Sequence, residues 1–164
     1  MTVNPTSICT ANRKPYFLDA RMAGIIEKEM EFRRTKKEIQ IYSYCIMPDH
    51  LHLLLSLNLG FQRKLQDWVS AFKRYTAKSA YEMADIKPLW QKNFYDRIAR
   101  DEESIIEIAQ YIVQNPVRKG IVPNWEIYPY RYLINKTARS ATGPYNHHDL
   151  INRHPQNLQP GSTQ

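Results

Sequence analysis

His50 and His52 stand two residues apart inside an apolar run, in the stretch MPDHLHLLL at residues 47–55. Alternate side chains of a β-strand point to the same face, so the two imidazoles project together while Leu51 and Leu53 point to the opposite, core-facing side. Two imidazoles held side by side can bind a metal ion. The alternative is a solvated histidine pair on a half-exposed strand, since imidazoles buried without hydrogen-bond partners would cost free energy.

The segments on either side predict the element that holds this pair. Residues 39–46 are dense in β-branched and aromatic side chains, which favour a strand. Residues 47–49 then turn the chain into a second strand at residues 50–57, so we expect an antiparallel hairpin.

The remaining elements follow from periodicity and from helix-end signals. Apolar spacing and Asp19 as N-cap predict a helix over residues 19–35, and the same spacing predicts another over residues 62–83. Acidic residues from Asp101 onward suit the start of a third helix, which Pro116 should end. Two further strands are expected at residues 6–10, with Pro5 limiting the first, and at residues 90–100.

The predicted order is therefore strand, helix, strand, strand, helix, strand, helix. This order predicts an α+β fold of the ferredoxin-like sandwich type, an antiparallel four-stranded sheet with helices covering one face and an added C-terminal helix.

Length and composition indicate one domain at residues 1–139 and a tail at residues 140–164. The tail is rich in Asn, Gln, Pro, Ser and Thr, so we expect it to be flexible. No stretch approaches eighteen apolar residues and no signal-peptide pattern begins the chain, so we expect no membrane association and a cytoplasmic location. Cys9 and Cys45 are expected to be free thiols, as in a reducing compartment.

The charge balance favours a phosphate-bearing partner. Twenty-three Lys and Arg against sixteen Asp and Glu give a net charge of +7. The helix at residues 62–83 has a basic face interleaved with tyrosines, typical of either a solvated surface or a nucleic-acid interface. The candidate DNA contacts are Lys73, Arg74, Arg97, Arg100, Arg118 and Lys119.

The third helix offers two more chemical groups. Tyr111 and Asn115 are four residues apart and so lie on one helical face, offset from the apolar stripe. A phenol there can reach a substrate, and an amide oxygen can coordinate an ion. The spacing is a weak signal by itself, because tyrosines on amphipathic helices usually pack in the core or at its rim.

Four motifs in order resemble one known family. They are PDHLH at residues 48–52, SAFK at 70–73, LWQKNFYDR at 89–97 and YIVQNPVRKG at 111–120. Together they resemble the REP-associated tyrosine transposases and their insertion-sequence relatives, which are single-tyrosine HUH endonucleases. The resemblance implies cleavage and rejoining of single-stranded DNA without an external energy source, often beside a folded hairpin.

The resemblance also implies roles for particular residues. By the family pattern, His50, His52 and Asn115 would hold a divalent cation, Mg²⁺ or Mn²⁺, although imidazole also suits softer ions. Tyr111 would attack the scissile phosphorus and form a 5′-phosphotyrosine. Tyr95, a second tyrosine in a family motif, ranks below it because relatives often carry other residues there.

Two alternatives stay open. A non-catalytic relative would bind DNA hairpins without forming an adduct, and a metal-dependent nuclease would use water in place of Tyr111. Since the family contains monomers as well as domain-swapped dimers, the sequence leaves the oligomeric state open too.

Overall fold

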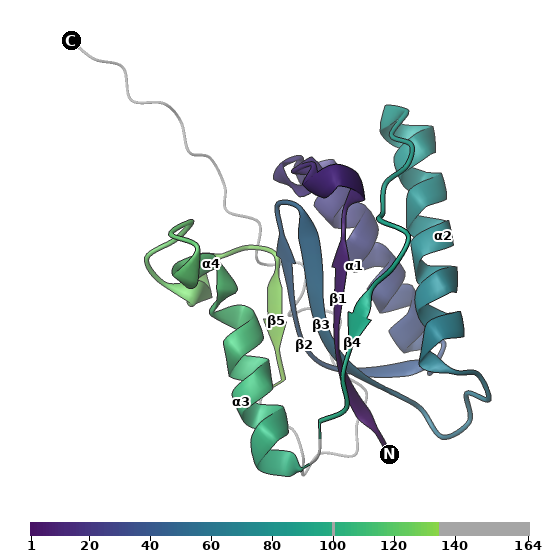
Figure 1. Ribbon diagram of the computed structural model, residues 1–164, viewed down its shortest axis with the longest axis vertical. Helices are drawn as coiled ribbons and strands as arrows, with labels where there is room; N and C mark the ends of the chain where they lie inside the picture. The colour runs from purple at the N-terminus through teal and green to yellow at the C-terminus, as the bar shows by residue number, and fades with distance from the viewer. Residues whose placement is uncertain (100, 135–164) are drawn as a thin grey trace.

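A computed structural model of the chain describes residues 1–99 and 101–134, in which one sheet lies between helices on both sides (Figure 1). The strands are β1 (Val3–Cys9), β2 (Ile39–Met47), β3 (His50–Leu57), β4 (Tyr95–Asp96) and β5 (Arg131–Leu133). The helices are α1 (Ala20–Thr35), α2 (Leu65–Ala84), α3 (Glu102–Val113) and α4 (Asn115–Arg118), with 3₁₀ turns at η1 (Ala11–Arg13), η2 (Tyr16–Leu18) and η3 (Trp125–Ile127). Arg100 and the predicted tail at residues 140–164 lie outside the described residues. No helix within the described ranges is both long and apolar enough to span a lipid bilayer.

The sheet confirms the predicted α+β class and adds a strand to it. All neighbours are antiparallel, in the order β4-β1-β3-β2-β5. The prediction of four strands was one short, because β5 forms a fifth strand beside β2. Three residues are too few to show an alternating pattern, so the sequence carried no signal for this strand.

The two faces of the sheet carry different side chains. On β3, Leu51, Leu53 and Leu55 are fully buried in the cluster that α1 and α2 complete. Leu54 points the other way and packs with Ile112 of α3. The helices therefore cover both faces rather than the one face expected, and the histidines belong to the face covered by α3.

The first strand begins three residues earlier than predicted, at Val3 instead of Thr6. Pro5 lies inside it, and its carbonyl accepts a hydrogen bond from the Arg97 N–H on the β4 side. In an antiparallel strand the N–H and C=O of one residue point to the same neighbour. The N–H that proline lacks is therefore missing from the β4 side, and the ladder with β3 is intact.

The predicted strand at residues 90–100 is mostly irregular. Of residues 90–99, only the two of β4 form a ladder with β1, and isolated bridges join Trp90 to Thr10 and Ala99 to Val3. Both β4 residues are exposed. An edge segment of this kind has little apolar burial to enforce a regular ladder, and the missing N–H of Pro5 faces it as well.

Helix α3 also ends differently from the prediction. It stops at Val113, and after Gln114 the chain forms the short helix α4 with Pro116 in its first turn. Proline is tolerated there because a first-turn N–H needs no helical partner. Asn115 thus starts α4 instead of extending α3. The predicted N-cap Asp19 accepts a backbone N–H as expected, and Asp101, at the predicted start of the third helix, is the N-cap there and accepts the Ser104 N–H.

Candidate active site

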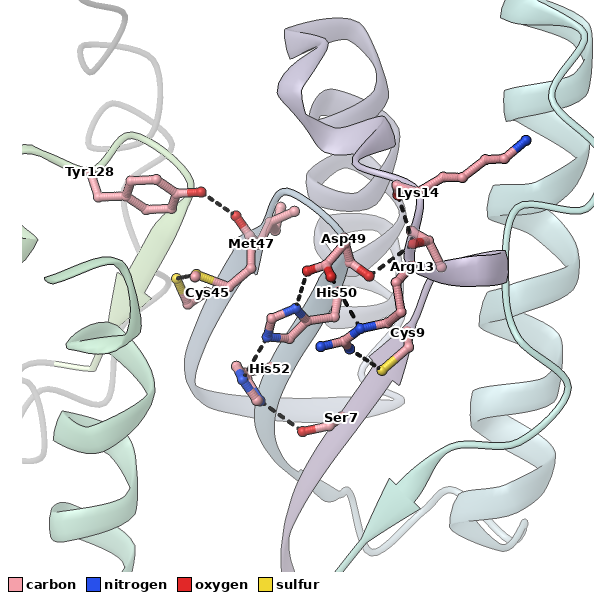
Figure 2. Close-up of polar contacts among 12 residues, drawn as sticks. Ser7, Cys9, Arg13, Lys14, Cys45, Met47, Asp49, His50, His52 and Tyr128 are labelled. Carbon is pink, nitrogen blue, oxygen red and sulfur yellow. Dashed lines mark hydrogen bonds and ion pairs between the residues drawn. The ribbon is translucent and has the colours of Figure 1, made fainter. Parts of the chain in front are cut away.

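His50 and His52 project together from β3, as the alternation predicted. Their Nε2 atoms are 2.9 Å apart, and the two rings are perpendicular (Figure 2). His50 is 8% exposed, and His52 is half-buried. The two nitrogens able to bind an ion therefore point at the same place.

The other nitrogen of each imidazole has a partner. Nδ1 of His50 lies 2.5 Å from Oδ1 of Asp49, and Nδ1 of His52 lies 2.7 Å from Oγ of Ser7 on β1 (Figure 2). An ionised carboxylate can only accept, so His50 donates through Nδ1 and its Nε2 carries a lone pair. Such contacts fix ring orientation in metal sites.

Burial keeps the imidazoles neutral. It lowers the pKa of His50 more than the Asp49 contact raises it. It also lowers the pKa of His52 to about 4, with the neighbouring His50 charge as a further cause. Neutral imidazole is the form that binds metals.

Asp49 is itself held in place by a contact from η1, the turn that follows β1. Its Oδ2 lies 3.1 Å from Nε of Arg13, and Nη1 of the same guanidinium donates to Sγ of Cys9 at 2.7 Å. Cys9 pairs with His50 in the β1–β3 ladder. One carboxylate oxygen thus contacts the histidine while the other is anchored by a cation (Figure 2).

On β2, the residues opposite the two histidines both carry sulfur. Cys45 pairs with His52 and Met47 with His50 in the β2–β3 ladder. Burial raises the pKa of the Cys45 thiol to about 12, so it stays neutral at ordinary pH. Both cysteines are free thiols, as predicted.

Tyr111 lies in a different setting, at the α3 end of the site. Its side chain is 60% exposed. The guanidinium of Arg118 sits 3.6 Å from the ring centroid and donates to the Tyr111 carbonyl at 2.7 Å. The charge of Arg118 also helps to lower the pKa of His52, although burial is the larger cause.

Asn115 is 6% exposed, and its Nδ2 donates to the Ile112 carbonyl, which leaves Oδ1 as the atom able to bind an ion. The structure therefore brings the two histidines together, and within the described residues neither Tyr111 nor Asn115 is in hydrogen-bond contact with them.

The other predicted contacts are spread over the molecule. The ammonium of Lys73 donates to the carbonyls of Gln91 and Lys92. Arg74 stacks on Tyr75 from α2, across the sheet from the histidines. Lys119 is exposed, and its charge reaches His50. The DNA-contact role of these residues stays a prediction.

Tyr95 occupies an unexpected place. It pairs with Ser7, which pairs with His52, so all three side chains lie on one face of the sheet. It is 74% exposed. Arg97, two residues on and also exposed, projects to that same face.

A family model described as "Transposase IS200 like" matches residues 6–115, a stretch that contains both histidines, Tyr111 and Asn115. The chain belongs to this family.

Similar proteins agree with this family assignment. The chain is 22% identical to a REP-associated tyrosine transposase of Escherichia coli, over 78% of this chain and 74% of that protein. It is 28% identical to a Haemophilus influenzae protein classed with the same transposases, over 61% of this chain and 65% of that protein. The chain spans less than two thirds of the two Haemophilus influenzae proteins that it matches.

The fold of this chain also has a solved counterpart. It superimposes with a TM-score of 0.67 and 20% identity on a REP-associated tyrosine transposase bound to a REP hairpin, over 84% of this chain and 80% of that one.

Sequence reasoning missed Ser7, Arg13 and the role of Asp49. Ser7 stands at the right alternation within β1, but only the β1–β3 register shows that it meets His52. Asp49 precedes the histidine directly and could have been suspected from its position.

Proposed function

We propose that this chain cuts and rejoins single-stranded DNA beside hairpins through a covalent bond to Tyr111. The observation that carries the proposal is the convergence of the His50 and His52 Nε2 atoms, which are 2.9 Å apart. The Nδ1 atom of each ring has a hydrogen-bond partner that fixes its orientation. A likeness in fold to a transposase bound to a REP hairpin supports hairpin DNA as the partner.

A divalent cation fits the donor set. Nε2 of His50 and of His52 would hold it together with Oδ1 of Asn115, and Mg²⁺ or Mn²⁺ is the proposed ion. Among the described residues no three His, Cys, Asp or Glu side chains form a metal-binding group, so an amide is a reasonable third ligand. When bound, the ion would offset negative charge at the scissile phosphate.

The residues of the chain carry out the bond changes. Tyr111 Oη loses its proton and attacks phosphorus, the Tyr–O–P bond forms, and the P–O3′ bond breaks as the 3′ oxygen gains a proton. A second 3′-hydroxyl then attacks the phosphotyrosine, which releases Tyr111 and restores a phosphodiester. Arg118 holds the tyrosine ring and supplies positive charge next to the reacting phosphate.

We propose a cytoplasmic location for the protein. We further propose that one chain supplies the whole site. What supports this is Arg118, which stacks on Tyr111 and acts on His52 within a single chain. Mixing His52→Ala with Tyr111→Phe protein tests it. No adduct should form in the mixture, whereas an adduct on the His52→Ala chain would indicate a site shared between two chains.

The central experiment uses Mn²⁺ and single-stranded DNA that carries the hairpins flanking the gene. We expect a protein–DNA adduct that survives denaturation, that is lost in Tyr111→Phe, and that is retained in the matched variant Tyr95→Phe. Cleavage without any adduct would favour a nuclease that uses water, and hairpin binding without cleavage would favour a binding protein.

A further inference from the structure

Tyr111 lines a cavity of about 490 Å³ between α3 and the segment that contains η3 and β5. Figure 1 shows α3 and β5 side by side. The cavity receives Glu107, Gln110 and Tyr111 from α3, and Trp125 and Leu133 from the opposite segment. Glu107 is the one charged side chain in the lining of this cavity. The proposed nucleophile therefore shares a cavity with a single carboxylate.

Glu107 and Tyr111 are neighbours on the surface of α3. Residues four apart lie on the same helical face. Side chains in a helix lean toward its N-terminus, so a side chain at position 111 covers the turn that carries Glu107. Both residues are exposed. The phenol and the carboxylate can therefore meet by side-chain rotation, without any movement of the backbone.

The Glu107 carboxylate is available as an acceptor. Within the described residues it forms no ion pair and no hydrogen bond, and the Tyr111 hydroxyl donates to no protein group. Asp49 differs, because one of its carboxylate oxygens contacts His50 and the other contacts Arg13. Of these two carboxylates, Glu107 is the one free to take a proton from the phenol.

The other groups around Tyr111 cannot accept its proton. The Arg118 guanidinium lies 3.6 Å from the ring centroid, and a guanidinium only donates. The lining side chains from η3 and β5 are uncharged, and the Arg131 guanidinium lies over the Trp125 ring at 4.9 Å. A phenol with a pKa of about 10 is mostly protonated at neutral pH, so the reaction needs an acceptor.

We propose that the Glu107 carboxylate accepts the Tyr111 proton during the attack on phosphorus. This inference rests on the proposed function and adds the proton acceptor to it. The Oη–H bond breaks and the proton passes to an Oε atom of Glu107, directly or through one water. The Oη–P bond forms, the P–O3′ bond breaks, and solvent gives a proton to the 3′ oxygen. In rejoining, the protonated carboxyl returns the proton to Oη as the Oη–P bond breaks.

The positions along the chain suit this division of roles. Glu107 stands four residues before Tyr111, and Asn115, the proposed third ligand of the ion, stands four residues after it. Glu107 is exposed, whereas Asn115 is buried. The acceptor and the ion ligand thus lie in opposite directions along the chain from the phenol, and the carboxylate does not compete with Asn115 for the cation.

The pH dependence of adduct formation tests the assignment. Single-turnover rates are measured on full-length protein with saturating Mn²⁺ and hairpin-bearing single-stranded DNA, from about pH 6 upward. The wild-type rate should change little with pH, because a carboxylate with a pKa of about 4.3 stays ionised there. Glu107→Gln should be slower by about 100-fold at pH 7, and its rate should rise about tenfold per pH unit because the phenol must ionise first.

Glu126→Gln is the matched control. Glu126 is an exposed carboxylate of η3 that does not line the cavity, and its substitution changes the net charge by the same amount. This variant should keep the wild-type rate and pH profile. A wild-type profile in Glu107→Gln would overturn the proposal, as would equal slowing by Glu126→Gln.

Chemical rescue separates proton transfer from a structural role. Glu107→Ala leaves space for a small carboxylate, so sodium formate should raise its rate several-fold over sodium chloride at the same ionic strength. Glu107→Gln fills that space and should gain nothing. A residue that only shapes the cavity would not respond to formate, and an equal rate in formate and chloride would contradict the proposal.

A binding measurement excludes an indirect effect on DNA. Affinity for the hairpin without Mn²⁺, measured by fluorescence anisotropy, should be the same in wild type and Glu107→Gln. A loss of affinity as large as the loss of rate would make Glu107 a DNA-binding residue and contradict the proposal.

Failure of this inference differs from failure of the proposed function. If the proposed function is wrong, the wild-type protein forms no adduct at any pH. If the acceptor alone is wrong, wild type and Glu107→Gln form the Tyr111 adduct at equal rates.

Discussion

The histidine pair and Tyr111 are built in opposite ways. The histidines lie on the central strand of the sheet, mostly buried, with each Nδ1 held by a named partner. Tyr111 is 60% exposed on a helix near the edge, and one arginine covers its ring.

Under the proposed function, this difference separates two requirements of one reaction. Ligands that hold an ion gain from rigidity, because orientation is set before binding. A nucleophile that must admit a phosphate, attack it and later release it needs space and some freedom to move. The histidine pair on the sheet is the rigid half of the proposed site, and Tyr111 near the end of α3 is its adjustable half.

The largest effect should come from removing the rigid half. His50→Ala/His52→Ala should abolish both adduct formation and the stabilisation by Mn²⁺, which at a hundred times the dissociation constant is about 2.7 kcal/mol in an intact site. Thermal unfolding with and without Mn²⁺ measures it. Cys45→Ala, at the ladder partner of His52, is the matched control and should keep the stabilisation. Stabilisation that persists without the histidines would place the ion elsewhere.

A smaller loss should follow from loosening the rigid half. Asp49→Ala removes the partner of the His50 Nδ1 atom and should weaken Mn²⁺ binding by about 10- to 100-fold, measured by calorimetry. Asp49→Asn keeps an acceptor oxygen and should recover part of the affinity. Equal affinity in all three proteins would show that the carboxylate does not position the ring.

Ser7→Ala should cost less again, because its contact with His52 is a neutral hydrogen bond. One such bond is worth about 0.5–1.5 kcal/mol, so Mn²⁺ affinity should fall about 2- to 10-fold in the same calorimetric titration. Ser7→Thr retains the hydroxyl and is the control. A loss larger than that of Asp49→Ala would reverse the ranking of the two contacts.

The adjustable half should show the smallest effect. Arg118→Ala removes the cation over the Tyr111 ring, a contact worth about 0.5–1 kcal/mol at an exposed site. Single-turnover adduct formation should slow about 2- to 5-fold while Mn²⁺ affinity is unchanged. Lost Mn²⁺ affinity would mean that Arg118 belongs to the rigid half.

The sequence predicts the local features of the site better than the contacts that depend on long-range pairing. The direction of the histidines, the hairpin and the α+β class depend on local alternation, which the sequence shows directly. The contacts of Ser7 and Arg13 depend on the register between β1 and β3 and on a tight turn after β1. Those are long-range facts, and no local pattern encodes them.

The same limit explains the errors at the edges. Pro5 suggested a late start for β1, because only the pairing shows that its missing N–H faces the weak β4 side. Pro116 indicated the end of α3, which does end before it, at Val113, but only the structure shows that the proline lies in the first turn of the next helix. Proline restricts one residue, and its neighbours in space decide what the restriction does.

The most direct test of the account is to locate the DNA on the protein. After reaction with Mn²⁺ and hairpin-bearing single-stranded DNA, the adduct is digested with nuclease and trypsin and analysed by mass spectrometry. Cleavage after Lys and Arg yields a peptide of residues 101–118 with Tyr111 as its one tyrosine, and a peptide of residues 93–97 with Tyr95. The account predicts the nucleotide on Tyr111, and a nucleotide on Tyr95 would contradict it.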